Sequence, residues 1–257
     1  MRTMKQLGKK GRFGNQLFQY AFLRMTAKDY QCPTWVGQAL FGHDDPPVTF
    51  DFHKVKEQQV YDYENSHLIG QDNIDITGYF QYHTRWIADR NYWRSLFQPV
   101  PSVCRAVSDT IEKLRAKGRT IVGLHLRRGD YGTFKRKSAR WCFVAPTGWY
   151  IQWLNDNMFR LDNPVLFIAS DEPDKVVQDF FQYDVVVADT TFEPDYYEDF
   201  YTLTQCDVML ISNSSFGFAA SMLNTKATEF YRPRLSEKRL IPYDPWNAYP
   251  TLHDERY

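Results

Sequence analysis

The 257-residue sequence contains only four cysteines, and no two of them are closer than 38 residues. This spacing excludes a Cys-x-x-Cys motif of the kind that binds zinc or performs disulfide exchange. We expect all four to be reduced thiols, as in a protein of a reducing compartment. They are Cys32, Cys104, Cys142 and Cys206.

The sequence also lacks any run that approaches the roughly 20 apolar residues needed to span a bilayer. Its first residues, MRTMKQLGKKGRFG, do not contain the apolar core of a signal peptide. From these two absences we expect a soluble, cytoplasmic protein with no membrane span.

Neither sign of charge is in excess, because 31 basic and 31 acidic side chains give a formal net charge of zero. Holding nucleic acid requires an excess of Lys and Arg, so we expect no nucleic-acid partner. Apolar residues make up 43% of the chain and no low-complexity tract is present, which excludes a disordered protein. A chain of this length can bury a substantial core in one large domain or in two smaller ones.

The best candidate for a domain boundary is the Gln98-Pro99-Val100-Pro101 segment, since no internal repeat or Gly/Ser linker is present. It predicts a first domain over 1–100 and a second over 101–257. A single helix is predicted directly after it, over 102–117, with Gly118 at its end. Its apolar face consists of Val103, Val107, Ile111 and Leu114.

Four short apolar runs rich in β-branched residues follow the boundary: 120–126 (TIVGLHL), 164–170 (PVLFIAS), 184–188 (DVVVA) and 207–211 (DVMLI). Such runs suit parallel strands that are buried on both faces. Predicted helices lie between them, over 149–159, 173–181 and 195–206. Alternating strands and helices predict a doubly wound α/β domain, in which ligands bind beyond the carboxyl ends of the strands.

The N-terminal part is predicted to form a second, smaller α/β domain. The segment GRFGNQ, 11–16, opens an amphipathic helix, and its two glycines allow a ligand to approach the backbone closely. The segment DITGYFQY, 75–82, is predicted to be a strand followed by a turn. The apolar residues at helical spacing in the first segment are Leu17, Phe18, Ala21, Phe22 and Met25.

The strongest candidate for a functional site is HLRRGDY, 125–131, at the end of the first predicted strand. One arginine can hold a phosphate with its planar guanidinium, while the other pairs with a carboxylate such as Asp130. His125 and Arg127 alternate with Leu126 and therefore lie on the same face. A surface cluster of salt bridges explains the same residues equally well.

Two further segments follow predicted strands. Asp171 and Glu172 either stabilise the N-terminus of the next helix or accept the two parallel N–H groups of a guanine edge. The segment SNSSFG, 212–217, precedes a predicted helix over 216–223, where hydroxyls and free N–H groups form either an N-cap or an anion site. A nucleoside diphosphate would use the arginines, hydroxyls, carboxylates and glycine loop together.

The motifs GRFGNQLFQYAF, GYFQ, HLRRGDY and DFYTLTQCDVMLISNSSFGFAASMLN resemble, in this order, those of the α-1,2-fucosyltransferases of glycosyltransferase family 11. They extend from about residue 11 to residue 224. The first, third and fourth are also similar to motifs of the wider fucosyltransferase group. The ordered set is much more specific than any one member.

The resemblance implies a GT-B fold, with two Rossmann-like domains facing a cleft and the donor bound mainly by the C-terminal domain, which leaves the acceptor side to the N-terminal one. It implies an inverting, metal-independent transfer of L-fucose from GDP-fucose to a hydroxyl of a glycan acceptor. The partners are then a nucleotide-sugar donor and a glycan, with no metal and no other cofactor. The absence of a D-x-D motif agrees with that expectation.

Residue roles carried over by position concern the donor. Arg127 would hold the β-phosphate and stabilise the leaving GDP, oriented by Arg128 and Asp130. His125 and either Asp171 or Glu172 would contact the nucleoside. The remaining donor-binding positions are Ser214 and Ser215 at the pyrophosphate, Asn213 and Phe216 beside them, and Gly14, Asn15 and Gln16 near the transferred sugar.

Three segments depart from the family pattern: 82–86, 144–150 and 216–220. They are expected to shape the sugar and acceptor pockets, so the linkage and the acceptor stay open. A transferase for another nucleotide sugar and an inactive carbohydrate-binding or scaffold protein are the alternatives. The catalytic base is unassigned between Asp130 and His83. Aromatic rings in or near these segments are candidates for an acceptor platform: Tyr79, Phe80, Tyr82, Trp86, Trp141, Trp149 and Tyr150.

Overall fold

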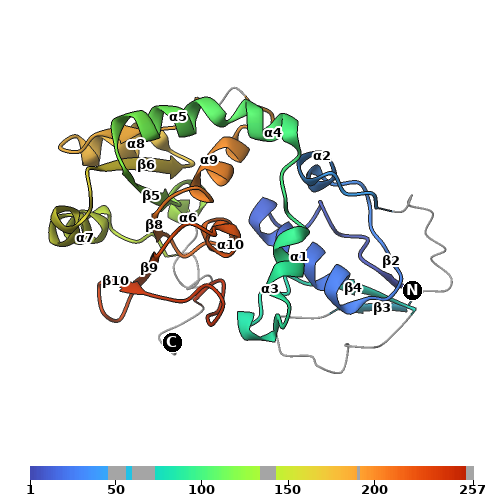
Figure 1. The fold of residues 1–257 in the computed structure, drawn as a ribbon. Helices are drawn as coiled ribbons and strands as arrows, with labels where there is room; N and C mark the ends of the chain where they lie inside the picture. Colours follow the sequence, from blue (N-terminus) through green and yellow to red (C-terminus); the bar gives the residue numbers. More distant parts are fainter. Residues whose placement is uncertain (46–55, 60–72, 134–142, 190–191, 253–257) are drawn as a thin grey trace. The chain divides into compact units, whose positions relative to one another are not determined.

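The computed structural model of the chain describes residues 1–45, 56–59, 73–133, 143–189 and 192–252. The chain divides into two compact units, Met1–Val103 and Cys104–Tyr257. Figure 1 shows the first unit in blue to green and the second in green to red.

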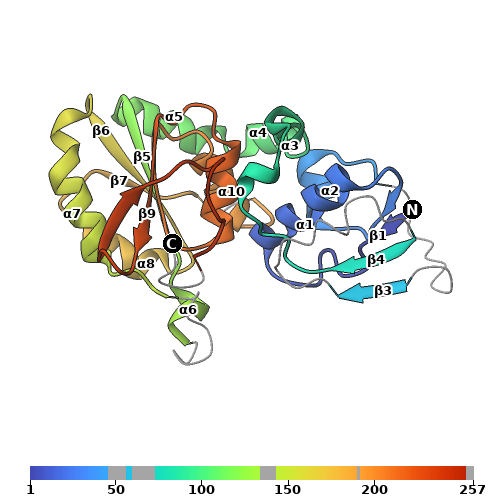
Figure 2. The same cartoon turned by 90° about the horizontal axis from the view of Figure 1, so that it is seen from below.

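The first unit contains a sheet of four strands in the order β2-β1-β4-β3, and every neighbouring pair is parallel. Figure 2 shows β1, β4 and β3 side by side. These strands have only two to four residues each, so they give no clear apolar pattern in the sequence. Their bounds are β1 Arg2–Thr3, β2 Tyr30–Gln31, β3 Lys56–Gln59 and β4 Ile74–Thr77.

Helix α1, Phe13–Thr26, is the main helix of this unit, and its predicted apolar residues Leu17, Phe18, Ala21 and Phe22 are buried. Its N-cap is Arg12, which makes no side-chain capping bond. The other helical elements are α2 Val36–Phe41, η2 Thr84–Trp86 and α3 Arg90–Ser95.

The second unit contains a six-stranded sheet in the order β10-β9-β8-β5-β6-β7. The four predicted apolar runs form four of these strands and are parallel to one another, as predicted. The strands are β5 Thr120–Leu126, β6 Pro164–Ser170, β7 Val185–Val186 and β8 Val208–Ile211. Two strands were not predicted: β9 Glu229–Arg234, parallel to β8, and β10 Arg239–Pro242, antiparallel to β9.

Helices cover both faces of this sheet. Val122, Leu124 and Leu126 of β5 face one side, where they form a core with Tyr150 and Leu154 of α7. The opposite face of β5 carries Gly123 and His125, which lie against α9 and α10. Figure 1 shows α9 and α10 beside β8. This is the doubly wound arrangement predicted from the alternating pattern.

The helical bounds of the second unit follow the predicted segments with one correction. The single helix predicted over 102–117 is wrong, because the chain leaves the helical region at Val107 (φ −104°, ψ 2°). The hydroxyl of Ser108 donates to the Arg105 carbonyl at 2.8 Å and so competes with the helical hydrogen bond. The elements are α4 Pro101–Ala106, α5 Ser108–Lys117, α6 Gly129–Thr133, α7 Thr147–Asn157, η3 Met158–Arg160, α8 Pro173–Val177, η4 Gln178–Phe180, α9 Tyr196–Leu203 and α10 Ser215–Leu223.

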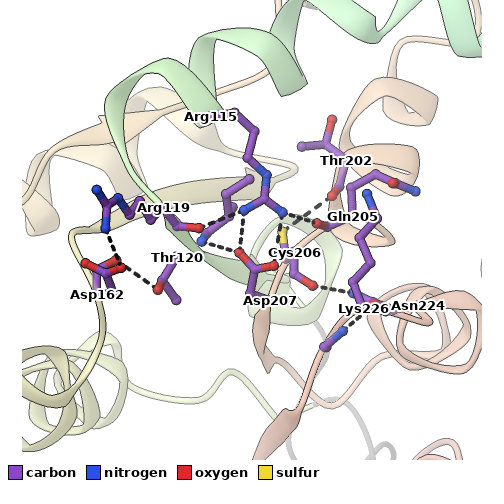
Figure 3. Close-up of polar contacts among 12 residues, drawn as sticks. Arg115, Arg119, Thr120, Asp162, Thr202, Gln205, Cys206, Asp207, Asn224 and Lys226 are labelled. Carbon is purple, nitrogen blue, oxygen red and sulfur yellow. Dashed lines mark hydrogen bonds and ion pairs between the residues drawn. The ribbon is translucent and has the colours of Figure 1, made fainter.

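A polar network joins elements at the amino ends of β5 and β8 (Figure 3). Arg115 of α5 donates from both terminal nitrogens to the Asp207 carboxylate, at 2.7 and 3.0 Å. Asp207 also accepts the Ile121 backbone N–H at 2.7 Å. A carboxylate held by a two-pronged arginine and a strand N–H fixes where these two strands begin.

Of the helices in the described ranges, none combines the length and the apolar composition that crossing a bilayer requires.

Candidate functional site

The site lies where the strand order of the second sheet reverses. From β5 the chain proceeds outward through β6 to β7, and then returns to place β8 on the other side of β5. In such sheets a crevice forms at this reversal, beyond the carboxyl ends of the strands. The predicted segments that begin at Arg127, Asp171 and Ser212 follow β5, β6 and β8, so the topology brings all three to this point.

Arg127 is held by two carboxylates at the end of β5. Its Nη1 lies 2.9 Å from Asp171 Oδ2, and its Nη2 lies 2.5 Å from Asp130 Oδ1. The guanidinium also lies over the Tyr131 ring, 5.5 Å from its centroid. Since only 14% of the side chain is exposed, the guanidinium has a defined position. The sequence predicted that one arginine holds a phosphate and that the other pairs with a carboxylate such as Asp130. In the structure Asp130 pairs with Arg127, the arginine that the resemblance assigns to the phosphate.

Arg128 is directed elsewhere. Its Nη1 donates to the Ala145 carbonyl at 2.7 Å, and its Nη2 donates to Thr147 Oγ1 at 3.0 Å, both next to the start of α7. Its backbone N–H donates to Asp171 Oδ1 at 2.8 Å. The structure therefore connects Arg128 to the site through its backbone, while its side chain secures the segment before α7.

Asp171 bridges the two arginines, because each of its oxygens accepts one of these bonds. Glu172 instead pairs with Lys175 at 2.9 Å and is the N-cap residue of α8. Ser170 joins the strand ends, since its hydroxyl donates to the Leu126 carbonyl at 2.8 Å and accepts the Glu172 N–H. The two adjacent carboxylates thus have different environments, which the sequence alone did not distinguish.

His125 is buried beneath α10. Its Nδ1 lies 3.1 Å from Ser212 Oγ, and its ring packs on Phe216 with centroids 5.1 Å apart. Ser212 Oγ also accepts the Arg127 backbone N–H at 3.2 Å. Burial, followed by the charges of Arg127 and Arg128, lowers the pKa of His125 to about 3, so its ring is neutral. His125 and Ser212 together fix the backbone that carries Arg127.

The serine segment forms the N-terminus of α10. Ser214 is the N-cap and accepts the Phe216 N–H at 3.3 Å, as the sequence allowed. Ser215 is buried in the first turn. Asn213 has a structural connection, since its side-chain amide exchanges two hydrogen bonds with the Leu252 backbone, at 3.0 and 2.7 Å. The helix N-terminus therefore lies directly beyond β8, next to β5, the strand that Arg127 follows.

Gly14, Asn15 and Gln16 lie in the first unit, in the first turn of α1. Asn15 Oδ1 accepts from Gln81 Nε2 at 2.5 Å, which links α1 to the turn after β4. Gln16 Nε2 donates to the Gly11 carbonyl at 3.2 Å. The first bond joins the GRFGNQ motif to the GYFQ motif, which follows β4, and the second closes the GRFGNQ segment on itself.

Of the candidate platform rings in the described ranges, two are buried, Phe80 and Tyr150, and the others are partly exposed. Phe80 stacks on Phe22 with centroids 4.3 Å apart, and Tyr82 and Trp86 both meet Phe22 edge-on at 5.7 Å. Tyr150 is fully buried and Trp149 packs against the core of the second unit. Trp141 is outside the described residues. Tyr79 is half-buried and lies beneath Lys10. Among the rings of this set in the described residues, it is the one for which we describe no packing against Phe22 or the core of the second unit.

Asp199 of α9 is a residue of this region that the sequence did not single out. Its carboxyl accepts the backbone N–H of Ser170, at the end of β6. Burial raises its pKa to about 8, with smaller contributions from Glu198 and Asp195. The sequence does contain a pattern that could have indicated Asp199. In YYEDFY, an acidic pair lies among aromatic residues, and the other residues of this helix are mostly buried.

Replacing Asp199 with asparagine should change how stability depends on pH. Since its folded-state pKa of about 8 exceeds the unfolded value of about 3.9, the folded chain binds more protons between these values. The free energy of unfolding of the wild type should therefore fall as pH rises from about 4 to about 8. Asp199→Asn should lose this part of the decline, as measured by urea denaturation at pH 5 and pH 8. Equal pH slopes for the two proteins would contradict the assignment.

The two α/β units, whose sheets are parallel except for β10, place the chain in the GT-B class of glycosyltransferase folds, and solved structures confirm this prediction. A mutant of Arabidopsis thaliana FUT1 in complex with GDP superposes with a TM-score of 0.58 at 11% identity, covering 93% of this chain and 71% of that one. The fucosyltransferase NodZ from Bradyrhizobium gives 0.52 at 12% identity, covering 95% and 96%. POFUT1 in complex with GDP gives 0.52 at 11% identity, covering 90% and 97%.

The chain belongs to glycosyl transferase family 11, whose family model matches residues 48–234. The family recognised from the motifs is therefore confirmed. Curated relatives include the galactoside alpha-(1,2)-fucosyltransferase 1 of Aotus nancymaae, 27% identical over 234 residues, and that of Gorilla gorilla gorilla, 27% identical over 236 residues. Each alignment covers 83% of this chain, which spans 63% of the length of these relatives.

Proposed function

We propose that the chain is an inverting, metal-independent fucosyltransferase that transfers L-fucose from GDP-fucose to a hydroxyl of a glycan acceptor. The observation that carries the proposal is the position of Arg127, a largely buried guanidinium at the strand-order reversal, next to the N-terminus of α10. Similar folds have been solved with GDP, and one, an alpha-1,6-fucosyltransferase, was soaked with GDP-fucose.

In the proposed reaction the acceptor oxygen attacks the anomeric carbon of fucose from the side opposite to GDP. The bond from that carbon to the β-phosphate oxygen breaks, and its electron pair goes to the phosphate. Arg127 stabilises the charge that develops there, and the N–H groups at the start of α10, with Ser214 and Ser215, bind the pyrophosphate. The acceptor proton goes to a base, for which Asp130 and His83 are the candidates.

The second unit would bind the donor and the first unit the acceptor side, with Gly14, Asn15 and Gln16 near the transferred sugar. For the nucleoside, Glu172 is the better of the two carboxylates, because both oxygens of Asp171 accept bonds from the arginines. The names of the curated relatives support the 2-hydroxyl of a galactoside as the acceptor atom.

Addition of GDP should raise the melting temperature of the chain. A ligand present at 100 times its dissociation constant stabilises the folded state by about 2.7 kcal/mol. UDP is the matched control and should give a smaller shift. The chain should then release GDP from GDP-fucose in the presence of a galactoside, measured by coupled nucleotide detection and by mass analysis of the glycan. Stabilisation without turnover on any acceptor would indicate a binding protein, and preferred turnover of another nucleotide sugar would change the donor.

A further inference from the structure

The segment that follows β10, residues 245–252, forms neither a helix nor a strand, yet most of it is buried. Because buried backbone outside a helix or a sheet must still satisfy its N–H and C=O groups, it depends on bonds to other parts of the chain. Two side chains of the second unit supply such bonds to residues 249–252. They are Asn213, between β8 and α10, and Arg232 of β9.

Asn213 binds Leu252 much as a neighbouring strand would. Its Nδ2 donates to the Leu252 carbonyl at 3.0 Å, and its Oδ1 accepts the Leu252 N–H at 2.7 Å. An asparagine amide carries the donor and the acceptor of a peptide unit, so one side chain can serve both backbone groups of a single residue. Both residues are buried. If the two separated, buried polar groups would be left without these bonds, which is costly.

Arg232 holds the same segment three residues earlier. Its Nη1 donates to the Tyr249 carbonyl at 2.7 Å, and its guanidinium lies over the Tyr243 ring, 5.0 Å from the centroid. Since β9 is the parallel neighbour of β8, the two contacts attach residues 249–252 to adjacent parts of one sheet. Both ends of this short stretch are therefore fixed to the second unit.

Asn213 also lies one residue before the N-cap of α10. The Ser214 N–H donates to the Ser212 carbonyl at 2.8 Å, and the Ser214 carbonyl accepts the Phe218 N–H at 3.1 Å. The connection from β8 to α10 is thus a tight turn through Asn213. In so short a turn the backbone of Asn213 sets the direction of the first N–H groups of the helix, which are the groups that can hold an anion.

We propose that residues 249–252 orient the pyrophosphate end of the donor site, with Asn213 as the positioning residue through which they act. This inference rests on the proposed function, because that function assigns the start of α10 to the pyrophosphate. With the segment bound, the N–H groups at the start of α10 already have the orientation that GDP requires. Without it they must be ordered when GDP binds, and that ordering lowers the affinity.

The test measures GDP binding to Asn213→Ala by isothermal titration calorimetry. Its affinity should be about tenfold lower than that of the wild type, the scale of one lost hydrogen bond. Asn224→Ala is the matched control, since Asn224 is a buried amide bonded to backbone groups at the other end of α10. It should lower the melting temperature and leave the GDP affinity within about twofold. A purely structural role of Asn213 predicts the same behaviour for both variants.

Leu252→Pro tests the other partner of the bond. Proline removes the N–H that Asn213 accepts, whereas Leu252→Ala shortens the same side chain and keeps that N–H. GDP should bind Leu252→Pro at least about threefold more weakly than Leu252→Ala. Thermal melting without GDP shows that each variant is folded, and Leu252→Pro decides the question if Asn213→Ala is not.

The outcomes separate this inference from the proposed function. If the wild type binds GDP and the folded variants Asn213→Ala and Leu252→Pro bind it equally well, this inference alone is overturned. It is also overturned if Asn224→Ala weakens GDP binding as much as Asn213→Ala does, because general destabilisation then explains both. If the wild type binds no GDP, the proposed donor is overturned and this inference with it.

Discussion

Replacing Arg127 with alanine should lower the rate of fucosyl transfer by about a thousandfold while the chain remains folded, because removing one preorganised donor to developing charge has effects of about this size. The guanidinium lies at the end of β5 and is held there by Asp130 and Asp171. Its charge acts in a position that is mostly screened from water, where electrostatic stabilisation is strongest. The measurement is the turnover number with GDP-fucose and a galactoside, together with a thermal melt.

Arg127→Lys should lower the rate of fucosyl transfer almost as much as Arg127→Ala. An ammonium is a point charge, and it cannot bond Asp171 and a phosphate oxygen along the two directions that a planar guanidinium provides. Arg119→Ala is the matched control, since Arg119 forms a pair with Asp162 in which both side chains are largely exposed. It should retain nearly full turnover. Near wild-type turnover of Arg127→Ala would show that the donor site lies elsewhere.

The sequence predicted the strands that carry the site because these strands are buried on both faces. Residues 120–126 and 164–170 are nearly continuous apolar runs, and the structure places strands at the same bounds. Strands β9 and β10 were missed because their sequences, EFYRPR and RLIP, are rich in arginine and contain proline. Arg232 of β9 is nevertheless buried, and its side chain donates to the Tyr249 carbonyl at 2.7 Å.

The location of the candidate site could be predicted from the sequence, but the contacts of its side chains could be predicted only in part. Topology dictates that the ends of β5, β6 and β8 meet, so strand assignment alone brought Arg127, Asp171 and Ser212 together. The partner of each arginine side chain was not predictable. Adjacent residues of identical type differ in their contacts, as Arg127 and Arg128 show, because the partners come from segments remote in sequence. Asp199 was missed for the same reason, since its bond to Ser170 joins two different elements.

Asn224 lies at the end of α10. Among the polar side chains of the second unit with described contacts, we expect its loss to destabilise that unit most. Its Nδ2 donates to the carbonyls of Leu203 and Cys206, at 3.1 and 2.8 Å. Its Oδ1 accepts the N–H groups of Lys226 and Ala227, at 2.7 and 2.8 Å. Figure 3 shows it beside the Arg115 and Asp207 network. One buried amide thus satisfies four backbone groups from the segments on either side of β8.

Asn224→Ala should lower the free energy of unfolding by roughly 3–4 kcal/mol, because each buried backbone group left without a partner costs about 1–3 kcal/mol and water can reach some of the four. Asn224→Asp keeps the two acceptor bonds and loses both donor bonds, so it should also destabilise the chain. Asn157→Ala is the matched control, since its amide makes only local bonds, donating to the Trp153 carbonyl and accepting from Arg160 Nε in an exposed position, and it should cost about 1 kcal/mol. Urea denaturation of the three variants gives the comparison. An Asn224→Ala effect no larger than that of Asn157→Ala would mean that the four backbone groups find other partners, and that the strand ends are fixed by the Arg115–Asp207 pair alone.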